Sequence, residues 1–252
     1  MFSTCLSRLS SATPFVLVLA LALAGCLASP VQAGQFSVSP VRIFIAPKDR
    51  TTAVTVTNES DVELVMQADI YQWQQTATGA EDLTLTEDVI VAPPIVKLAP
   101  GAKQTIRLAM LKPVSAGQQL TYRLIVREIP EVRPPEPGIQ LRIALAFSLP
   151  IFISQPGVKN QLVCELKRSA PDAVRAECEN RGTAYAQATE FKLLNAAGAV
   201  LASNNTATYV LPGIKRSVEV KRAAGPIAGG KIQLVVTQDD QTVQTFDAVI
   251  AD

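Results

Sequence analysis

A glycine-rich loop, a cluster of acids and a pair of cysteines are the parts of this 252-residue sequence that could carry chemistry. Residues 225–231 read GPIAGGK, which fits the G-x-x-x-x-G-K spacing of a phosphate-binding loop. That motif needs Ser or Thr next and a helix to follow, whereas Ile232 opens the strand-like run IQLVVTQ. We therefore interpret residues 225–231 as a loop between strands.

Other catalytic and metal-binding patterns are also missing from the sequence. It contains no histidine, which excludes Ser–His and Cys–His dyads and every zinc site with a His ligand. The acids Glu81, Asp82, Glu87 and Asp88 lack the glycine and ligand alternation of calcium loops, so we interpret them as solvent-facing turn residues. We expect a protein that is not an enzyme and holds neither a metal nor another cofactor.

The charge balance argues against a nucleic-acid partner. Lys and Arg number 23 and Asp and Glu number 22, which leaves a net charge of +1. Binding to a phosphate backbone requires clustered basic side chains, and no such stripe is present.

The first 33 residues are predicted to be a targeting segment, with an apolar run at 14–25 that is too short to span a bilayer comfortably. Two processing sites compete. A small-residue cleavage site ends at Ala33, whereas Leu-Ala-Gly-Cys resembles a lipobox that would leave Cys26 acylated. We favour cleavage after Ala33, because strand-like residues begin directly afterwards, and we expect export.

Export determines how the cysteines are interpreted. The mature chain would retain Cys164 and Cys178, one pair in an oxidising compartment. Both lie in alternating strand patterns separated by a turn signal, SAPDA, so the two side chains can face each other across a hairpin. Since their spacing is not C-x-x-C, we predict a structural disulfide and not a redox site.

The rest of the chain has the pattern of one strand after another. Short alternating runs are separated by turn signals such as APKDR, NESD and LAPGAK, and no amphipathic helix of ten residues is evident. Two series of about seven strands predict an all-β protein with two immunoglobulin-like antiparallel β-sandwich domains in tandem. We place these domains at residues 34–154 and 155–252. Pro40 reverses the parity of the apolar residues in the first strand, which predicts that this strand changes sheet there.

The longest alternating run is IQLRIALAFSLPIFI, residues 139–153. Every odd position is large and apolar: Ile139, Leu141, Ile143, Leu145, Phe147, Leu149, Ile151 and Ile153. A strand of this length is about three times the usual one and would extend about 50 Å. Such a strand is longer than a small sandwich is wide, so part of the row could cover another surface; the alternative is that the row is ordinary sandwich core.

Four stretches in order resemble the PapD-like periplasmic chaperones of the chaperone–usher pathway: SPVRIFIAP (39–47), VAPPIVKLAPGAKQTIRL (91–108), TYRLIVREIP (121–130) and the run 139–153. TYRLIV together with FSLPIF (147–152) is most similar to the archaic branch of that family. The resemblance implies a periplasmic chaperone that binds pilin subunits by donor-strand complementation and delivers them to an outer-membrane usher.

The resemblance also implies roles for particular residues. The donor strand, whose apolar side chains fill the groove of an incomplete pilin, would comprise Ile139, Leu141, Ile143, Leu145 and Phe147. The remaining odd positions, Leu149, Ile151 and Ile153, would belong to the chaperone's own core.

Arg42 matches the family's cleft arginine, which anchors the pilin's C-terminal carboxylate. The family's second cleft cation is a lysine, but here the matching residue is Pro150. Arg107 is the substitute candidate, and its alternative is an ordinary solvent-facing arginine. Ala92-Pro93-Pro94 would form the family's proline-constrained corner, which can contain a cis peptide bond.

A second functional hypothesis is an exported structural or adhesive β-sandwich protein, lipid-anchored through Cys26, whose long strand serves self-association. In either case the unpaired strand is a liability for edge-to-edge pairing, and a self-capped homodimer is the expected form of such pairing.

Overall fold

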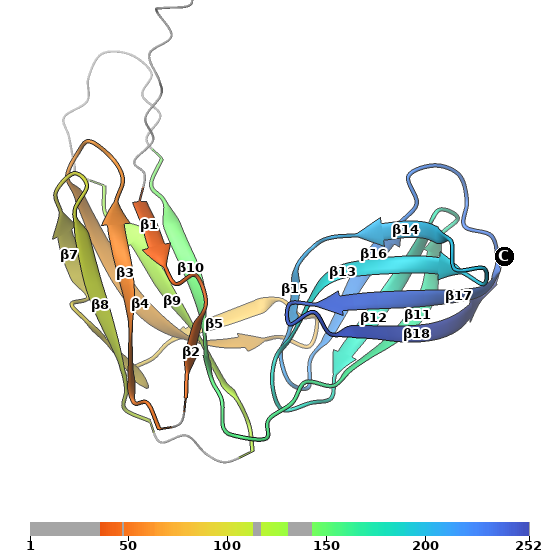
Figure 1. The fold of residues 1–252 in the computed structure, drawn as a ribbon, viewed down its shortest axis with the longest axis horizontal. Helices are drawn as coiled ribbons and strands as arrows, with labels where there is room; N and C mark the ends of the chain where they lie inside the picture. Colours follow the sequence, from red (N-terminus) through yellow and green to blue (C-terminus); the bar gives the residue numbers. More distant parts are fainter. Residues whose placement is uncertain (1–35, 47, 113–116, 131–142, 252) are drawn as a thin grey trace, which may run out of the picture.

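The computed structural model describes residues 36–46, 48–112, 117–130 and 143–251 (Figure 1). The predicted targeting segment and two predicted donor residues, Ile139 and Leu141, lie outside these ranges. Every regular element within them is a β-strand, which confirms the predicted all-β class. In the part of the chain that is described, no helix is long and apolar enough to cross a membrane.

The first sandwich consists of two sheets. One has the order β1 (Phe36–Ser39), β3 (Thr51–Asn58), β8 (Lys103–Met110) and β6 (Val89–Ala92). The other has the order β2 (Ile43–Ile45), β10 (Ala146–Ile153), β9 (Leu120–Glu128), β4 (Leu64–Gln75) and β5 (Glu81–Leu85), with β7 (Ile95–Leu98) also paired to β4.

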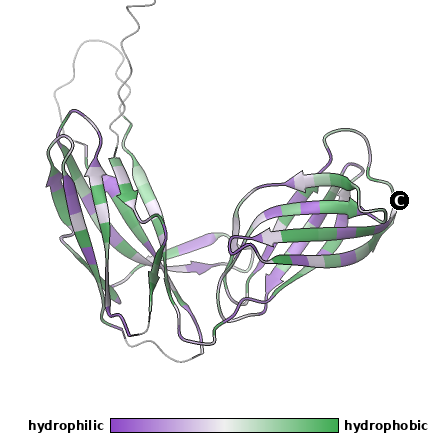
Figure 2. Ribbon diagram, in the orientation of Figure 1, coloured by the Kyte–Doolittle hydropathy of each residue, from purple (hydrophilic) through white to green (hydrophobic). Residues whose placement is uncertain are grey.

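Alternation along the strands builds the core between these sheets. Val54 and Val56 of β3, like Ile106 and Leu108 of β8, are buried, while their neighbours face outward. The banding of apolar and polar residues is visible along the strands in Figure 2.

The chain changes sheet at Pro40, as predicted. β1 pairs antiparallel with β3 in the first sheet, and β2 pairs parallel with β10 in the second. The Ser39–Pro40 and Ala92–Pro93 peptide bonds are both cis, the second at the predicted corner.

The second sandwich begins after residues 154–161. One sheet has the order β11 (Leu162–Ala170), β12 (Ala173–Asn180) and β16 (Lys215–Lys221). The other has the order β14 (Val200–Asn204), β13 (Ala186–Asn195), β17 (Gly230–Gln238) and β18 (Val243–Ile250), with β15 (Thr208–Val210) also paired to β13.

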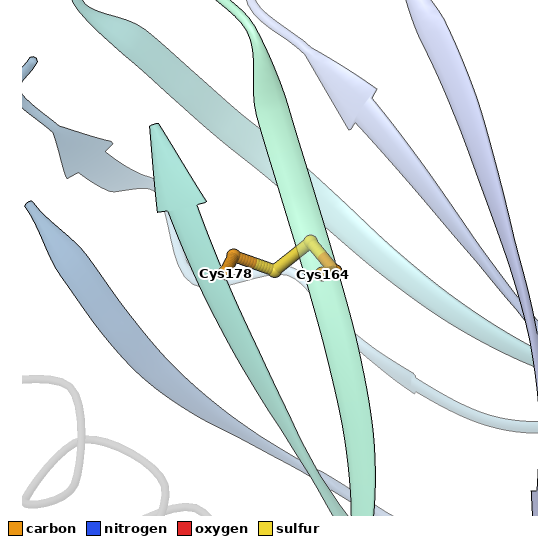
Figure 3. The surroundings of a disulfide bond; sticks show 2 residues. All are labelled: Cys164 and Cys178. Atoms are coloured by element: carbon orange, nitrogen blue, oxygen red, sulfur yellow. A yellow bond between two sulfur atoms is a disulfide. The ribbon is translucent and has the colours of Figure 1, made fainter. Parts of the chain in front are cut away.

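A disulfide joins two strands of the second sandwich (Figure 3). Cys164 of β11 and Cys178 of β12 are cross-strand partners with Cα atoms 4.0 Å apart. Both side chains are buried in the core of this domain, which confirms the pairing predicted from the sequence.

The two sandwiches meet at an angle, and the hairpin formed by β4 and β5 reaches from the first towards β15 of the second (Figure 1). The side chain of Gln75, near the end of β4, donates to the carbonyl of Tyr209 and accepts from the amide of Leu211. A third hydrophobic cluster lies at this junction: Trp73, Phe152 and Leu211, with Leu83, Tyr185, Tyr209 and Ile214 packed around them. We call it the interdomain cluster.

Candidate functional site

One edge of β10 is unpaired over part of its length. β9 pairs with all of β10, but β2 pairs only with its last three residues, Ile151–Ile153. Within the described residues, the segment from Ala146 to Pro150 therefore has no strand on its second edge. Unpaired N–H and C=O groups at such an edge are a template for another strand.

The odd-numbered residues near this edge become more exposed towards the N-terminal end of β10. Leu149, Ile151 and Ile153 are buried in the first core. Leu145 and Phe147 are partly buried against it, and Ile143 is 57% exposed. The side chains of this apolar row are thus less and less buried towards the N-terminal end, and the first described one, Ile143, is exposed to solvent.

The predicted strand of residues 139–153 is regular only from Ala146 onward in the described part. The amide of Glu128 donates to the carbonyl of Leu145, and β9 ends at Glu128. Residues 143–145 are not part of a strand: β9 reaches only as far as Leu145 and offers no partner to residues 143 and 144. Phe147 has a second contact, since its ring meets that of Phe36 edge to face at 4.9 Å.

The structure places Arg42 at the junction of the two domains. Its guanidinium forms an ion pair with Asp239 and donates a hydrogen bond to the side-chain oxygen of Gln187. The hydroxyl of Tyr185 lies 3.5 Å from Nη1. Burial lowers the pKa of Arg42, but Tyr209, Tyr185 and Asp239 outweigh it, so the pKa is raised. All of these neighbours belong to the second domain.

Arg107 lies elsewhere on the first domain. It is exposed on β8 between the buried Ile106 and Leu108, and its cross-strand partners are Ala53 and Ala92. Its side chain forms no hydrogen bond or ion pair with any described residue. The structure therefore does not bring Arg107 and Arg42 together: one faces solvent and the other contacts the second domain.

A cation that the sequence analysis missed is Arg123 of β9. It is the cross-strand partner of Pro150, the position at which the expected lysine is absent. Arg123 is only 7% exposed, forms an ion pair with Glu81, and stacks on the ring of Trp73 with its guanidinium carbon 3.8 Å from the centroid. The signal that could have identified it was its place in TYRLIV, opposite Pro150 in a hairpin register.

The interdomain cluster brings both arginines to one aromatic ring. The guanidinium carbons of Arg42 and Arg123 lie 5.9 and 5.6 Å from the ring centroid of Tyr209. The ring of Trp73 meets the same tyrosine edge to face at 5.2 Å. The junction therefore combines guanidinium groups, which attract carboxylates, with aromatic rings that pack apolar groups.

The described residues provide no further chemical centre. No group of three or more His, Cys, Asp or Glu side chains among them is arranged to hold a metal ion. Of the acids predicted to be solvent-facing, Glu81 pairs with Arg123, and Asp88 accepts hydrogen bonds from Tyr122 and Lys112.

Comparison with known proteins gives a family match for the first domain. A profile of the family described as "Pili and flagellar-assembly chaperone, PapD N-terminal domain" matches residues 35–159. A search of curated protein sequences found no match.

Several solved structures share the fold of both domains. The chaperone–tip adhesion subunit complex CsuC–CsuE, from archaic chaperone–usher Csu pili of Acinetobacter baumannii, contains a chain that matches with a TM-score of 0.62 and 18% identity, covering 86% of this chain and 100% of that one. The E. coli chaperone DraB matches with a TM-score of 0.56 and 18% identity, covering 86% and 97%. The Salmonella enterica complex of the SafA pilin with the SafB chaperone matches with a TM-score of 0.57 and 13% identity, covering 88% and 100%.

Proposed function

Because this chain, through its N-terminal domain, belongs to the PapD-like family of pilus-assembly chaperones, we propose that it captures pilin subunits by donor-strand complementation. An incomplete subunit exposes an apolar groove, and a strand of the chaperone fills it until assembly. The chaperone then delivers the subunit to an outer-membrane usher. This sequence of events requires neither a bound nucleotide nor a catalytic residue.

The observation that carries the proposal is the combination of an unpaired edge and an apolar row on β10. The backbone from Ala146 to Pro150 can pair with a new strand. The side chains of Phe147 and Leu145 are only partly buried in the chaperone's own core, and that of Ile143 is exposed. We assign the same donor role to Ile139 and Leu141, which precede them at the same parity.

The five apolar side chains of the donor strand can bury enough surface for tight capture of a subunit. Fully burying one large apolar side chain stabilises a complex by roughly 1.5–3 kcal/mol, so five supply roughly 8–15 kcal/mol before the costs of ordering and association. The side-chain period of two also sets the register, because a slip by one residue would present Arg142 to the apolar groove.

We assign the anchor for the subunit's C-terminal carboxylate to Arg42. Its guanidinium lies at the domain junction and is partly exposed, and it is flanked in sequence by the exposed Val41, with the exposed Phe44 two residues further on. Arg107 remains the second candidate, supported by its exposure and by the absence of a side-chain partner among the described residues.

The remaining assignments follow from this role. The targeting segment would be removed after Ala33 and release the chaperone into the periplasm, where the disulfide forms. The two functional domains would comprise residues 34–154 and 155–252. Without a subunit, two copies would cover each other's β10 edges as a homodimer.

Periplasmic co-expression with the fimbrial subunit encoded beside this gene tests the proposal. Size-exclusion chromatography of the wild type should yield a soluble one-to-one complex. Arg42→Ala should weaken or abolish that complex, whereas Arg50→Ala, a matched control at an exposed arginine of the same domain, should leave it intact. A complex indifferent to Arg42 would move the anchor to Arg107. No complex with any neighbouring subunit would favour the adhesive function.

A further inference from the structure

The guanidinium assigned to the subunit's carboxylate already holds a carboxylate of this chain. Asp239 follows β17 and forms an ion pair with Nη1 of Arg42, while the side-chain oxygen of Gln187 accepts from Nη2. Both terminal nitrogens of Arg42 are therefore engaged by the second domain. A carboxylate that binds an arginine in two parallel hydrogen bonds needs such a pair of nitrogens.

Asp239 is held in place by its own domain. Its carboxylate accepts a hydrogen bond of 3.0 Å from the hydroxyl of Tyr185, and its amide donates to the carbonyl of Gln187 at 3.0 Å. Its side chain is 14% exposed, compared with 31% for that of Arg42. The acid is thus the less exposed of the two, and about a third of the arginine side chain remains open to solvent.

Two carboxylates cannot share this one guanidinium without cost. Arg42 carries a single positive charge, so a second carboxylate brought beside Asp239 would experience the repulsion that drives close carboxylates apart. Arg123 does not relieve that repulsion, since it is paired with Glu81. An incoming carboxylate must therefore replace Asp239.

We propose that Asp239 is an internal competitor for the subunit: in the free protein its carboxylate occupies Arg42, and a subunit's C-terminal carboxylate binds by displacing it. This inference rests on the proposed function of Arg42 as the anchor. It makes capture of a subunit and opening of the Arg42–Asp239 contact one coupled event. Asp239 thereby sets how tightly a subunit's carboxylate must bind Arg42 before the Arg42–Asp239 ion pair opens.

The same coupling has a consequence for subunits that lack a free C-terminal carboxylate. Such a subunit has no group to exchange for Asp239, so the Arg42–Asp239 contact stays closed. Discrimination against it arises from an acid in the chaperone as well as from the cation.

A competition experiment tests this assignment. Wild type and Asp239→Asn, carrying different tags, are co-expressed with the neighbouring fimbrial subunit, and their shares of the subunit are measured by mass spectrometry. Asn keeps the size of Asp and one acceptor oxygen, but it removes the negative charge. We expect Asp239→Asn to capture the subunit about 5- to 150-fold more tightly, the usual range for coupling between two binding events.

Three variants serve as controls. The side chain of Asp240 accepts, among the described residues, only from the amide of Thr242 in the same turn, so Asp240→Asn should behave as the wild type. Tyr185→Phe removes the hydrogen bond to Asp239 without changing any charge and should give a smaller gain in capture. This variant provides the test if Asp239→Asn fails to fold. In the Arg42→Ala background, Asp239→Asn should give no gain.

The outcomes separate the two proposals. If Arg42→Ala loses the subunit but neither Asp239→Asn nor Tyr185→Phe gains any, Asp239 is not a competitor and the anchor stands. If Asp239→Asn gains equally in the Arg42→Ala background, the gain does not pass through Arg42 and the inference is overturned. If the wild type captures no subunit, the proposed function fails and the inference fails with it.

Discussion

Tyr185 of the second domain stacks on Phe152 of β10, with ring centroids 3.8 Å apart and ring planes at 15°. This contact ties the strand with the unpaired edge directly to the other domain. Phe152 faces away from the first core, at the parity opposite to Ile151 and Ile153, yet it is fully buried because the second domain covers it.

Removing this ring should loosen the junction between the domains. Phe152→Ala is expected to lower the free energy of unfolding by about 3–5 kcal/mol, the usual cost of truncating a buried phenylalanine. Trp73 is the single tryptophan of the chain and lies 6.0 Å from Phe152, so its fluorescence during urea unfolding reports the loss. Phe44→Ala, which removes an exposed ring stacked on the same residue, should cost far less. Equal losses would contradict the interdomain role of Phe152.

The exposure gradient along β10 predicts opposite effects at two isoleucines of equal parity. Ile143→Asp should change the free energy of unfolding by no more than about 0.5 kcal/mol, because the side chain is exposed, yet it should abolish subunit capture. Ile151→Asp should prevent folding, because it buries a carboxylate in the first core. Urea unfolding and size-exclusion with the subunit separate the two readouts. An Ile143→Asp protein that fails to fold would contradict the donor assignment.

The disulfide should stabilise the second domain by reducing the conformational entropy of its unfolded chain. Cys164 and Cys178 are separated by 14 residues, and closing a loop of about that length stabilises a fold by about 3 kcal/mol. Cys164→Ala/Cys178→Ala should therefore lower the unfolding temperature of this domain in calorimetry. A reductant should lower it for the wild type and leave the double variant unchanged. A double variant as stable as the wild type would show that the bond contributes little.

Tyr122 should make the protein less stable in alkali. Burial, followed by the hydrogen bond from its hydroxyl to Asp88 at 2.9 Å and the charge of that acid, raises the pKa of Tyr122. The unfolded chain loses this proton near pH 10, while the folded protein keeps it. The free energy of unfolding should therefore be unaffected below about pH 10 and fall as the pH rises from there towards the raised pKa.

Tyr122→Phe removes that titration. Urea unfolding measured from about pH 8 to about pH 11 should show a shallower alkaline decline for this variant, even though its stability at neutral pH is reduced by the lost hydrogen bond. The same slope in the wild type and in Tyr122→Phe would exclude Tyr122 as the source.

Local patterns were sufficient to predict the strands, the change of sheet at Pro40 and the disulfide. Each depends on which face of one strand or hairpin a side chain occupies, and alternation reveals that directly. The end of β10 at Ala146 was beyond such reasoning, because it depends on where its partner β9 stops.

The surroundings of the arginines were not predictable for a different reason. Arg42 contacts Gln187 and Asp239, which lie 145 and 197 residues away in the sequence. Arg123 is buried because the second domain and Trp73 cover it, although its parity in β9 indicated a solvent-facing side chain. No pattern within one strand encodes how two domains meet.

Pro150 gives the unpaired edge of β10 a definite end. Proline has no N–H to donate, so it fits in a strand where that nitrogen faces away from the neighbouring ladder. Here that neighbour is β9, and Pro150 immediately precedes the three residues that pair with β2. A strand added alongside Ala146 to Leu149 would therefore lose a hydrogen-bond donor at Pro150 and then meet β2. Pro150 and β2 therefore set the position beyond which a guest strand cannot extend along this edge towards the domain junction.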